Sequence, residues 1–242
     1  GLVKKVVVAD NLAPVVDQAF AIPAYAPPME LLISLYFFAF QLYCDFSGYT
    51  DMAIGLSLLF GIALHENFRR PFLSVSVSEF WSRRWHISLG NWFRDYLFFP
   101  LTGTAKSHAM RQHMALLSVF AASGLWHAGQ GYGVGWAFVV WGLLNGAYVS
   151  AEKLMQPAGR RLTKRFPRLL NSAAMTVLRV LVTFHLILIT WTFFRAETVG
   201  DALTILRRIA LALPELPHLV MRYPFSTGHY LGVALIAALL LI

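Results

Sequence analysis

Long apolar segments separated by short charged clusters constrain this chain more than any other feature. Residues 29–64 read MELLISLYFFAFQLYCDFSGYTDMAIGLSLLFGIAL, which is long enough for more than one crossing, since a spanning helix needs about 20 residues. Hydrophobic residues make up 57% of the sequence and charged residues 13%, whereas a soluble domain carries about 25% charged residues. The sequence therefore predicts an all-α, polytopic helical membrane protein.

The segments predict different kinds of helix. The polar middle of residues 29–64 predicts two helices or one broken helix, and the mixed stretch 66–111 predicts interfacial and re-entrant helices. We expect one membrane-embedded domain over residues 1–242, belonging to a longer polytopic protein, because the N-terminus begins inside an amphipathic pattern. Further spans are predicted at 113–126, 132–150, 173–194 and from near His229 onward, with an amphipathic interfacial helix at 200–213.

Basic residues predict the orientation. By the positive-inside rule, a basic loop at residues 152–170 faces the cytoplasm. Counting back one crossing places the turn after His127 toward the outer side, and a second crossing returns residues 66–111 to the cytoplasm. The net charge of +8 comes from such clusters and from no separate basic domain, so we expect no nucleic-acid partner. The six basic residues of the loop are Lys153, Arg160, Arg161, Lys164, Arg165 and Arg168.

Two carboxylates lie within an apolar segment. Insertion of an Asp at the centre of a spanning helix costs about 2.5–3.5 kcal/mol, so such residues face a cavity or a partner. In QLYCDFSGYTDMAIG, Gln41, Asp45 and Gly48 are spaced so that they lie on one face of a helix. Ser47 and Asp51 are spaced so that they lie together on the adjacent face. These residues form either a polar wall along a substrate path or a hydrogen-bonded helix contact.

Arginine and aromatic residues alternate in SEFWSRRWHISLGNWFRDYLFFPL, residues 78–101. Tryptophan and snorkelling arginine are typical of the headgroup level. The alternative is a pocket in which Arg83, Arg84 and Arg94 hold the anionic tail of an acyl carrier. Ser78, followed by Glu79, predicts a helix start.

A histidine lies in the apolar run SGLWHAG, residues 123–129. Imidazole is the usual general base near neutral pH, but a buried neutral histidine can also serve only to satisfy hydrogen bonds. The glycine-rich turn that follows His127 allows close approach of a ligand to the backbone.

The sequence lacks the HExxH, GxSxG and P-loop motifs of zinc proteases, serine hydrolases and nucleotide-driven pumps. Cys44 is the only cysteine, which excludes an intramolecular disulfide and a cysteine-based metal cluster.

Five motifs in order resemble the membrane-bound O-acyltransferase family, and within it the bacterial alginate O-acetyltransferase type. The resemblance implies helical enzymes with a funnel through the bilayer, in which an acyl group from a cytoplasmic donor reaches an acceptor on the other side. His127 matches the family's membrane-embedded histidine in GLWH, and His86 matches a second histidine in RWHISL. The motifs are YCDFSGYTDMAIGLSLLFGI, ENFRRPF, EFWSRRWHISLGNWFRDYLFFPL, SGLWHAG with FVVWG, and FHLILITWTFFRA.

Two positions depart from the family pattern. Ala128 stands where the family usually has Gly, and the stretch from His127 to Trp136 is several residues longer than usual. A longer turn reshapes the mouth of the funnel, so the departure bears on the acceptor more than on the chemistry.

The resemblance implies a role for each candidate residue. His127 acts on the acceptor as a general base or orients it, and His86 assists. We expect no metal and no bound cofactor; the donor substrate is acetyl-CoA or another cytoplasmic acetyl carrier. The residues expected to bind or position substrate are Trp126, Asp45, Ser47, Tyr49, Asp51, Arg84 and Trp85.

The expected setting is the inner membrane of a bacterium. There the protein contacts membrane lipid and works with periplasmic partner proteins in the O-acetylation of an exported, alginate-like polysaccharide. Two alternatives share the chemistry, namely D-alanylation of teichoic acids and O-acetylation of peptidoglycan. A third is a transporter that moves an acyl group without chemistry. An enzyme that lacks His127 keeps ligand binding and loses turnover, whereas a transporter still moves its substrate.

Overall fold

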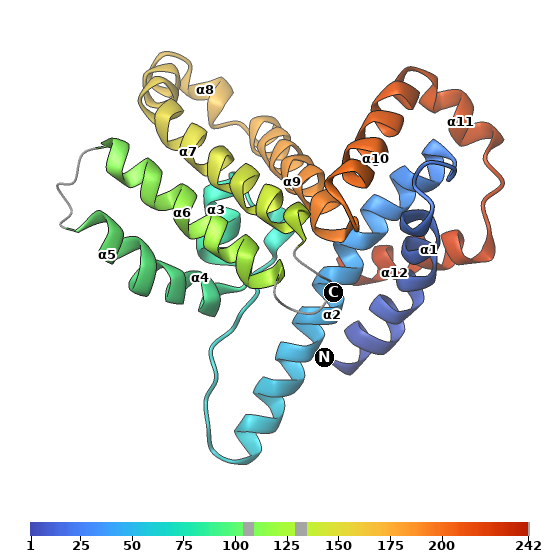
Figure 1. The fold of residues 1–242 in the computed structure, drawn as a ribbon, viewed down its shortest axis with the longest axis horizontal. Coiled ribbons are helices and arrows are strands. Elements are labelled where there is room, and N and C mark those ends of the chain that lie inside the picture. The colour runs from blue at the N-terminus through green and yellow to red at the C-terminus, as the bar shows by residue number, and fades with distance from the viewer. Residues whose placement is uncertain (104–108, 129–134, 242) are drawn as a thin grey trace. The chain divides into compact units, whose positions relative to one another are not determined.

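The computed structural model describes residues 1–103, 109–128 and 135–241, and in this part the regular elements are helices (Figure 1). The exception within it is an isolated antiparallel bridge between Phe68 and Trp85. The all-α prediction is confirmed. The chain groups into two compact units, Gly1–His65 with Arg195–Ile242, and Glu66–Phe194. Each unit is described by itself below, and the single domain expected from the sequence stays a prediction.

The first unit is organised around α2 (Pro28–Leu59), an unbroken helix of 32 residues. The prediction of two helices or a broken one for this segment was wrong. Proline occurs only at the first turn, where a missing N–H costs nothing, and each interior glycine costs only about 1 kcal/mol. The carboxylates that made the middle look interrupted are paired with lysines of η1 (Val3–Ala9), Asp45 with Lys5 and Asp51 with Lys4.

Other helices of the first unit pack around α2. Helix α1 (Asp10–Ala21) contacts both α2 and α12 (Thr227–Leu241), and Leu12, Val16 and Leu31 are completely buried there. The amphipathic helix predicted at 200–213 is α10 (Val199–Ala212), which buries Ala202 and Ile205 and exposes Leu203 and Leu211. It continues into η5 (Leu213–Glu215) and α11 (Leu216–Arg222).

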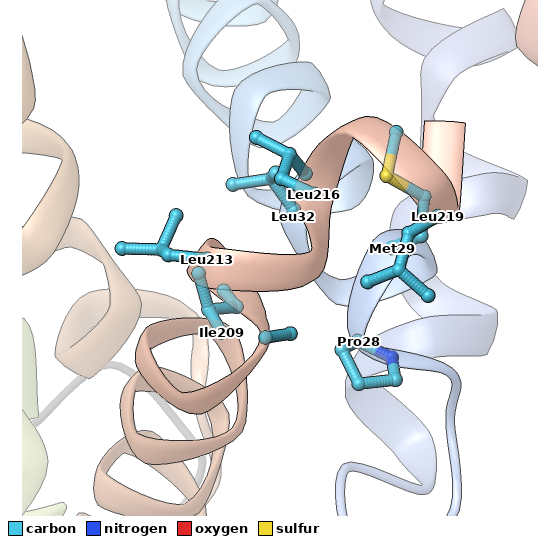
Figure 2. Close-up of a pocket in the computed structure, with 8 residues that line it drawn as sticks. Pro28, Met29, Leu32, Ile209, Leu213, Leu216 and Leu219 are labelled. Atoms are coloured by element: carbon cyan, nitrogen blue, oxygen red, sulfur yellow. The ribbon is translucent and has the colours of Figure 1, made fainter. Parts of the chain in front are cut away.

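A small apolar hollow lies where the start of α2 meets α10, η5 and α11 (Figure 2). The side chains of its lining residues are hydrocarbon apart from one methionine sulfur, so none of these side chains accepts or donates a proton. We interpret it as a packing hollow. The lining residues are Pro28, Met29, Leu32, Ile209, Ala212, Leu213, Leu216 and Leu219.

The second unit begins with short helices and continues with longer ones. The short ones are η2 (Pro71–Leu73), α3 (Val77–Glu79), η3 (Phe80–Arg84), α4 (Ile87–Phe93), η4 (Arg94–Phe98) and α5 (Phe99–Thr102). The later elements are α6 (Ala109–Ala128), α7 (Trp136–Arg165), α8 (Pro167–Leu170) and α9 (Ala173–Arg195).

The helix start predicted at Ser78 lies two residues too late. Ser76 is the N-cap of α3, and its Oγ accepts the N–H of Glu79 at 3.0 Å. The capping pattern is therefore Ser-x-x-Glu from Ser76. A carboxylate from α7 completes the cap, because Glu152 accepts the N–H groups of Val77 and Ser78 at 2.6 and 2.9 Å.

Helices α6 and α7 lie side by side with backbones in close contact (Figure 1). A Cβ added at Gly124 would overlap the carbonyl oxygen of Phe138, and one at Gly142 would overlap that of Phe120. Small residues permit this approach of two helices. Because His127 follows Gly124 by three residues on α6, this contact brings the histidine against α7.

The basic segment at residues 152–170 is helical, and its prediction as a loop was wrong. Helix α7 continues to Arg165, and α8 follows after Phe166. Ten of its 19 residues are Leu, Arg or Lys, which favour helix, so its charge did not indicate a loop.

Among the residues that the structure describes, two helices are long and apolar enough to cross a membrane by length and composition, α2 with 32 residues and α9 with 23. Along α9, Val177, Leu181 and Val182 are about half exposed, as expected for side chains that face lipid. The predicted spans in α6, α7 and α12, and the predicted orientation, stay predictions.

Candidate active site

His127 lies near the end of α6 within a group of aromatic rings. Its imidazole contacts Phe194 of α9 at 5.1 Å between ring centroids, Trp141 of α7 at 5.4 Å and Phe138 of α7 at 6.3 Å. Phe194 also packs on Trp141 and Phe138, at 5.1 and 5.0 Å. Three rings from two helices therefore fix the position of the imidazole, which remains partly exposed.

A hydrogen-bonded asparagine supports this aromatic group from behind. Asn145 is fully buried on α7; its Oδ1 accepts the indole N–H of Trp81 at 2.9 Å, and its Nδ2 donates to the backbone oxygen of Trp141 at 2.8 Å. Trp81 in turn packs edge-on against Trp141 at 5.5 Å. The indole N–H of Trp141 is buried and has no hydrogen-bond partner within the described residues.

His86 occupies an unusual backbone conformation. It precedes α4 with φ +45°, and Arg70 is the other non-glycine residue with positive φ in the described part of the chain. Such conformations cost of order 1–3 kcal/mol and gather at functional sites. Neighbouring hydrogen bonds hold it, because Asn67 accepts the N–H of Ile87 through its backbone oxygen at 3.1 Å and the N–H of Ser88 through Oδ1 at 3.0 Å.

The two histidines are close enough to influence each other electrostatically. Burial and then the positive charge of a protonated His127 lower the pKa of His86 from 6.5 to about 4. His86 lies between helices in the segment predicted to be interfacial, outside the candidate spans. At neutral pH its imidazole is therefore uncharged and has one N–H donor and one acceptor nitrogen.

The neighbours of His86 have internal partners. The guanidinium of Arg84 pairs with Glu79 at 2.8 Å and donates to the backbone oxygens of Arg69 and Arg70. The ring of Trp85 is buried between Phe80, Phe68 and Trp191. Both residues, predicted to bind substrate, thus hold the loop that presents His86; a direct contact with substrate stays a prediction.

Trp126 points to a different side of α6 from His127. Its ring is half exposed and contacts Trp92 of α4 at 6.4 Å. Ala128, the first departure from the family pattern, is buried at the end of α6. The longer turn, the second departure, lies at residues 129–134, outside the described residues.

The polar residues of α2 lie in the first unit and are described separately from the histidines. The carboxylate of Asp45 lies 2.6 Å from Lys5 Nζ, and that of Asp51 lies 2.8 Å from Lys4 Nζ. Ser47 is buried, its hydroxyl without a hydrogen-bond partner in the described part of the chain, and Tyr49 is exposed. These contacts favour the helix-contact interpretation for the two carboxylates; their predicted role in substrate binding stays a prediction.

Sequence reasoning missed Trp141, Phe194, Asn145 and Trp81 as parts of the site. Trp141 and Phe194 lie in the quoted motifs FVVWG and FHLILITWTFFRA, so a signal existed, but it did not show which side of the helix faced His127. Asn145 carried a signal of its own, since an amide within an apolar helix needs partners.

Comparison with known proteins identifies the class to which this fold and site belong. The sequence profile of MBOAT, the membrane-bound O-acyltransferase family, matches residues 1–195. The chain belongs to this family of polytopic membrane proteins.

Curated bacterial relatives differ in the activity that their names print. The "Peptidoglycan O-acetyltransferase" of Helicobacter pylori is 38% identical over 207 residues, which cover 86% of this chain and 36% of the relative. The "Probable alginate O-acetylase AlgI" of Pseudomonas aeruginosa is 40% identical over 202 residues, 84% of this chain and 35% of the relative. The "Teichoic acid D-alanyltransferase" of Bacillus subtilis is 30% identical over 172 residues, 69% of this chain and 41% of the relative. The chain thus spans little more than a third of the length of the first two relatives.

Proposed function

We propose that this chain carries the catalytic histidine of a membrane-bound O-acyltransferase that acetylates a hydroxyl group of an exported polysaccharide. The observation that carries the proposal is the position of His127, held by three aromatic rings near a second histidine that is neutral at physiological pH. Fixed geometry is what a general base requires, because proton transfer depends on hydrogen-bond reach to the acceptor hydroxyl.

The proposed reaction is an acyl transfer from a thioester. The imidazole of His127 takes the proton of the acceptor hydroxyl while the hydroxyl oxygen forms a bond with the acyl carbon. The bond between the acyl carbon and sulfur breaks. The departing thiolate takes the proton from the protonated His127 and leaves as a thiol, which restores the neutral imidazole. The unpartnered N–H of Trp141 is a donor for the carbonyl oxygen that gains charge in this step. His86 orients the donor or supports His127.

The relatives favour an acetyl group over a D-alanyl group. The two acetyl-transferring relatives share 38% and 40% identity with 86% and 84% of this chain, whereas the D-alanyl relative shares 30% with 69%. We propose an alginate-like polymer as acceptor, with peptidoglycan as the alternative that the similarity to the Helicobacter protein supports.

The setting follows from this proposal. The donor is acetyl-CoA or another acetyl carrier of the cytoplasm, and the protein resides in the bacterial inner membrane. Periplasmic partner proteins complete the modification of the polymer. No metal and no bound cofactor takes part in the proposed steps.

Binding and turnover of the donor distinguish an enzyme from a transporter. Membranes with full-length protein are incubated with labelled acetyl-CoA, and bound label and released CoA are measured for wild type and His127→Ala. We expect His127→Ala to bind the donor as the wild type does and to release no CoA. Continued passage of acetyl groups across vesicles of the variant would favour the transporter. A wild type that neither binds nor consumes acetyl-CoA would remove this donor from the proposal.

A further inference from the structure

From Lys153 to its end, the helical basic segment of residues 152–170 has positive charge without an internal counter-charge. From residue 153 to residue 196 the sequence contains neither Asp nor Glu. The nearest preceding carboxylate, that of Glu152, accepts the N–H groups of Val77 and Ser78. Within the described part of the chain, none of the segment's six cations, Lys153, Arg160, Arg161, Lys164, Arg165 and Arg168, forms a salt bridge.

The same segment exposes four apolar side chains, called the apolar stripe below. Met155, Leu162, Phe166 and Leu169 are exposed by 48–62% of their surface. At 3.6 residues per turn, Met155 and Leu162 lie two turns apart on the same side of α7. Arg160 and Lys164 lie on the opposite side, about half a turn away. The C-terminal part of α7 is therefore amphipathic, with leucine and methionine opposite arginine and lysine.

With the predicted span at residues 132–150 in the bilayer, α7 is long enough for its C-terminal part to extend beyond the apolar core. The 30 residues of α7 extend about 45 Å, whereas the hydrocarbon core is about 30 Å thick. Pro157 lies inside the helix at the start of the amphipathic part and removes one backbone hydrogen bond there. Lys153 and Arg165 lie over the rings of Phe98 and Phe166, and Arg160 donates to Gln156, but none of these contacts neutralises a charge. Because the apolar residues are exposed and the cations form no salt bridge among the described residues, the segment fits the boundary between acyl chains and headgroups.

We propose that the basic segment lies in the membrane interface and binds anionic phospholipid headgroups. Each Lys or Arg near an anionic leaflet is attracted to its negative surface potential, and the apolar stripe inserts between the acyl chains, as in interfacial amphipathic helices. A nucleic acid would match the cations and leave the apolar stripe in water, which disfavours that partner. The inference does not depend on the chemistry at His127.

A fluorescent probe on the apolar stripe tests this placement. In the full-length protein, with other cysteines including Cys44 replaced, Leu162→Cys is labelled with an environment-sensitive fluorophore. The protein is reconstituted into vesicles of phosphatidylcholine alone or with 30% phosphatidylglycerol, some of which contain lipids brominated on the acyl chain. We expect strong quenching by brominated lipid with phosphatidylglycerol and clearly weaker quenching without it. Adding salt to about 1 M should reduce the difference, since the Debye length falls to about 3 Å.

Charge variants complete the test. Arg160→Gln with Lys164→Gln should lose most of the phosphatidylglycerol-dependent quenching, whereas Arg207→Gln with Arg222→Gln, an equal change in net charge elsewhere, should keep it. Equal quenching in both lipids and in both variants would overturn the role of the headgroup charge. A probe that neither brominated lipid nor an aqueous quencher reaches would show that protein covers the stripe. A probe that responds to soluble DNA and not to the vesicles would replace the lipid by a nucleic acid.

Discussion

The imidazole of His127 meets the indole of Trp141 edge to face, with ring centroids 5.4 Å apart and ring planes at 86°. The contact joins the end of α6 to the first turns of α7. It depends on glycine at the crossing, because Gly124 and Gly142 let the two backbones touch. Two glycines, which have no side chain, thus permit the helix contact that positions the imidazole.

A methyl group added at the glycine crossing of α6 and α7 should destabilise the protein. In Gly142→Ala, the new methyl group overlaps the carbonyl oxygen of Phe120, and overpacking of this kind costs about 1–3 kcal/mol. Thermal unfolding of the full-length protein in detergent should show a lower midpoint. At Gly159 on the same helix, an added carbon has no atom within 4 Å apart from its chain neighbours and the backbone of its own helical turns, so the midpoint of Gly159→Ala should stay equal or rise. Equal midpoints for both variants would contradict the close crossing.

Removal of the Asn145 amide should weaken the support of the site. Asn145→Leu leaves the Trp81 N–H without its acceptor, and an unsatisfied buried donor costs about 1–3 kcal/mol. We expect a lower unfolding midpoint and reduced acetyl transfer. Ser150→Ala is the matched control on α7, since its buried hydroxyl has no partner within the described residues. If Asn145→Leu behaves like Ser150→Ala, the hydrogen bonds of Asn145 are not what holds Trp81 and Trp141.

A charge exchange tests the ion pair between η1 and α2. Lys4 Nζ lies 2.8 Å from Asp51, so Asp51→Lys places two cations together and should lower the amount of protein in the membrane. Lys4→Asp should have a similar effect through two carboxylates. The double variant Lys4→Asp with Asp51→Lys should recover most of the wild-type level on an immunoblot. Recovery of protein without recovery of activity would assign Asp51 a role in substrate binding as well.

The acid sensitivity of the fold should depend on His86. Its pKa is 6.5 when unperturbed and about 4 in the folded protein, so between these values the unfolded chain binds more protons than the folded one. Stability therefore rises with pH from about 4 to 6.5. Measured over this range, the midpoint of His86→Gln should rise less steeply than that of the wild type. Parallel profiles would show that His86 titrates normally in the folded protein.

Hydropathy predicted the class of fold, and an imidazole in an apolar run indicated His127, because both are local signals. His86 came from the family resemblance alone, and the catalytic roles of both histidines stay predictions. Hydropathy and motifs failed where one local sequence pattern is compatible with two different structures. The carboxylates of α2 resembled a helix break, but lysines from η1 neutralise them. The basic segment resembled a loop, although its residues favour helix.

The partners of His127 were harder to predict. Phe194 lies 67 residues further along the chain, and its contact with the imidazole at 5.1 Å depends on how α9 packs against α6 and α7. The strain at His86 depends on hydrogen bonds to Asn67, which no spacing in the sequence indicated. Such features arise from tertiary packing between residues that are far apart in the sequence.

The acetyl content of the exported polymer in a strain with His127→Gln tests the general-base role most directly. The full-length variant is expressed in a deletion strain, its membrane level is checked by immunoblot, and acetyl ester on the polymer is measured. His185→Gln is the matched control, because His185 is exposed on α9 and bonds to the Leu181 carbonyl of its own helix. General-base catalysis contributes about 10²–10⁴-fold, so His127→Gln should reduce the acetyl ester below detection at normal protein levels, and His185→Gln should retain it. Wild-type acetyl content in His127→Gln would contradict the account, since a glutamine amide can form hydrogen bonds but cannot take the proton.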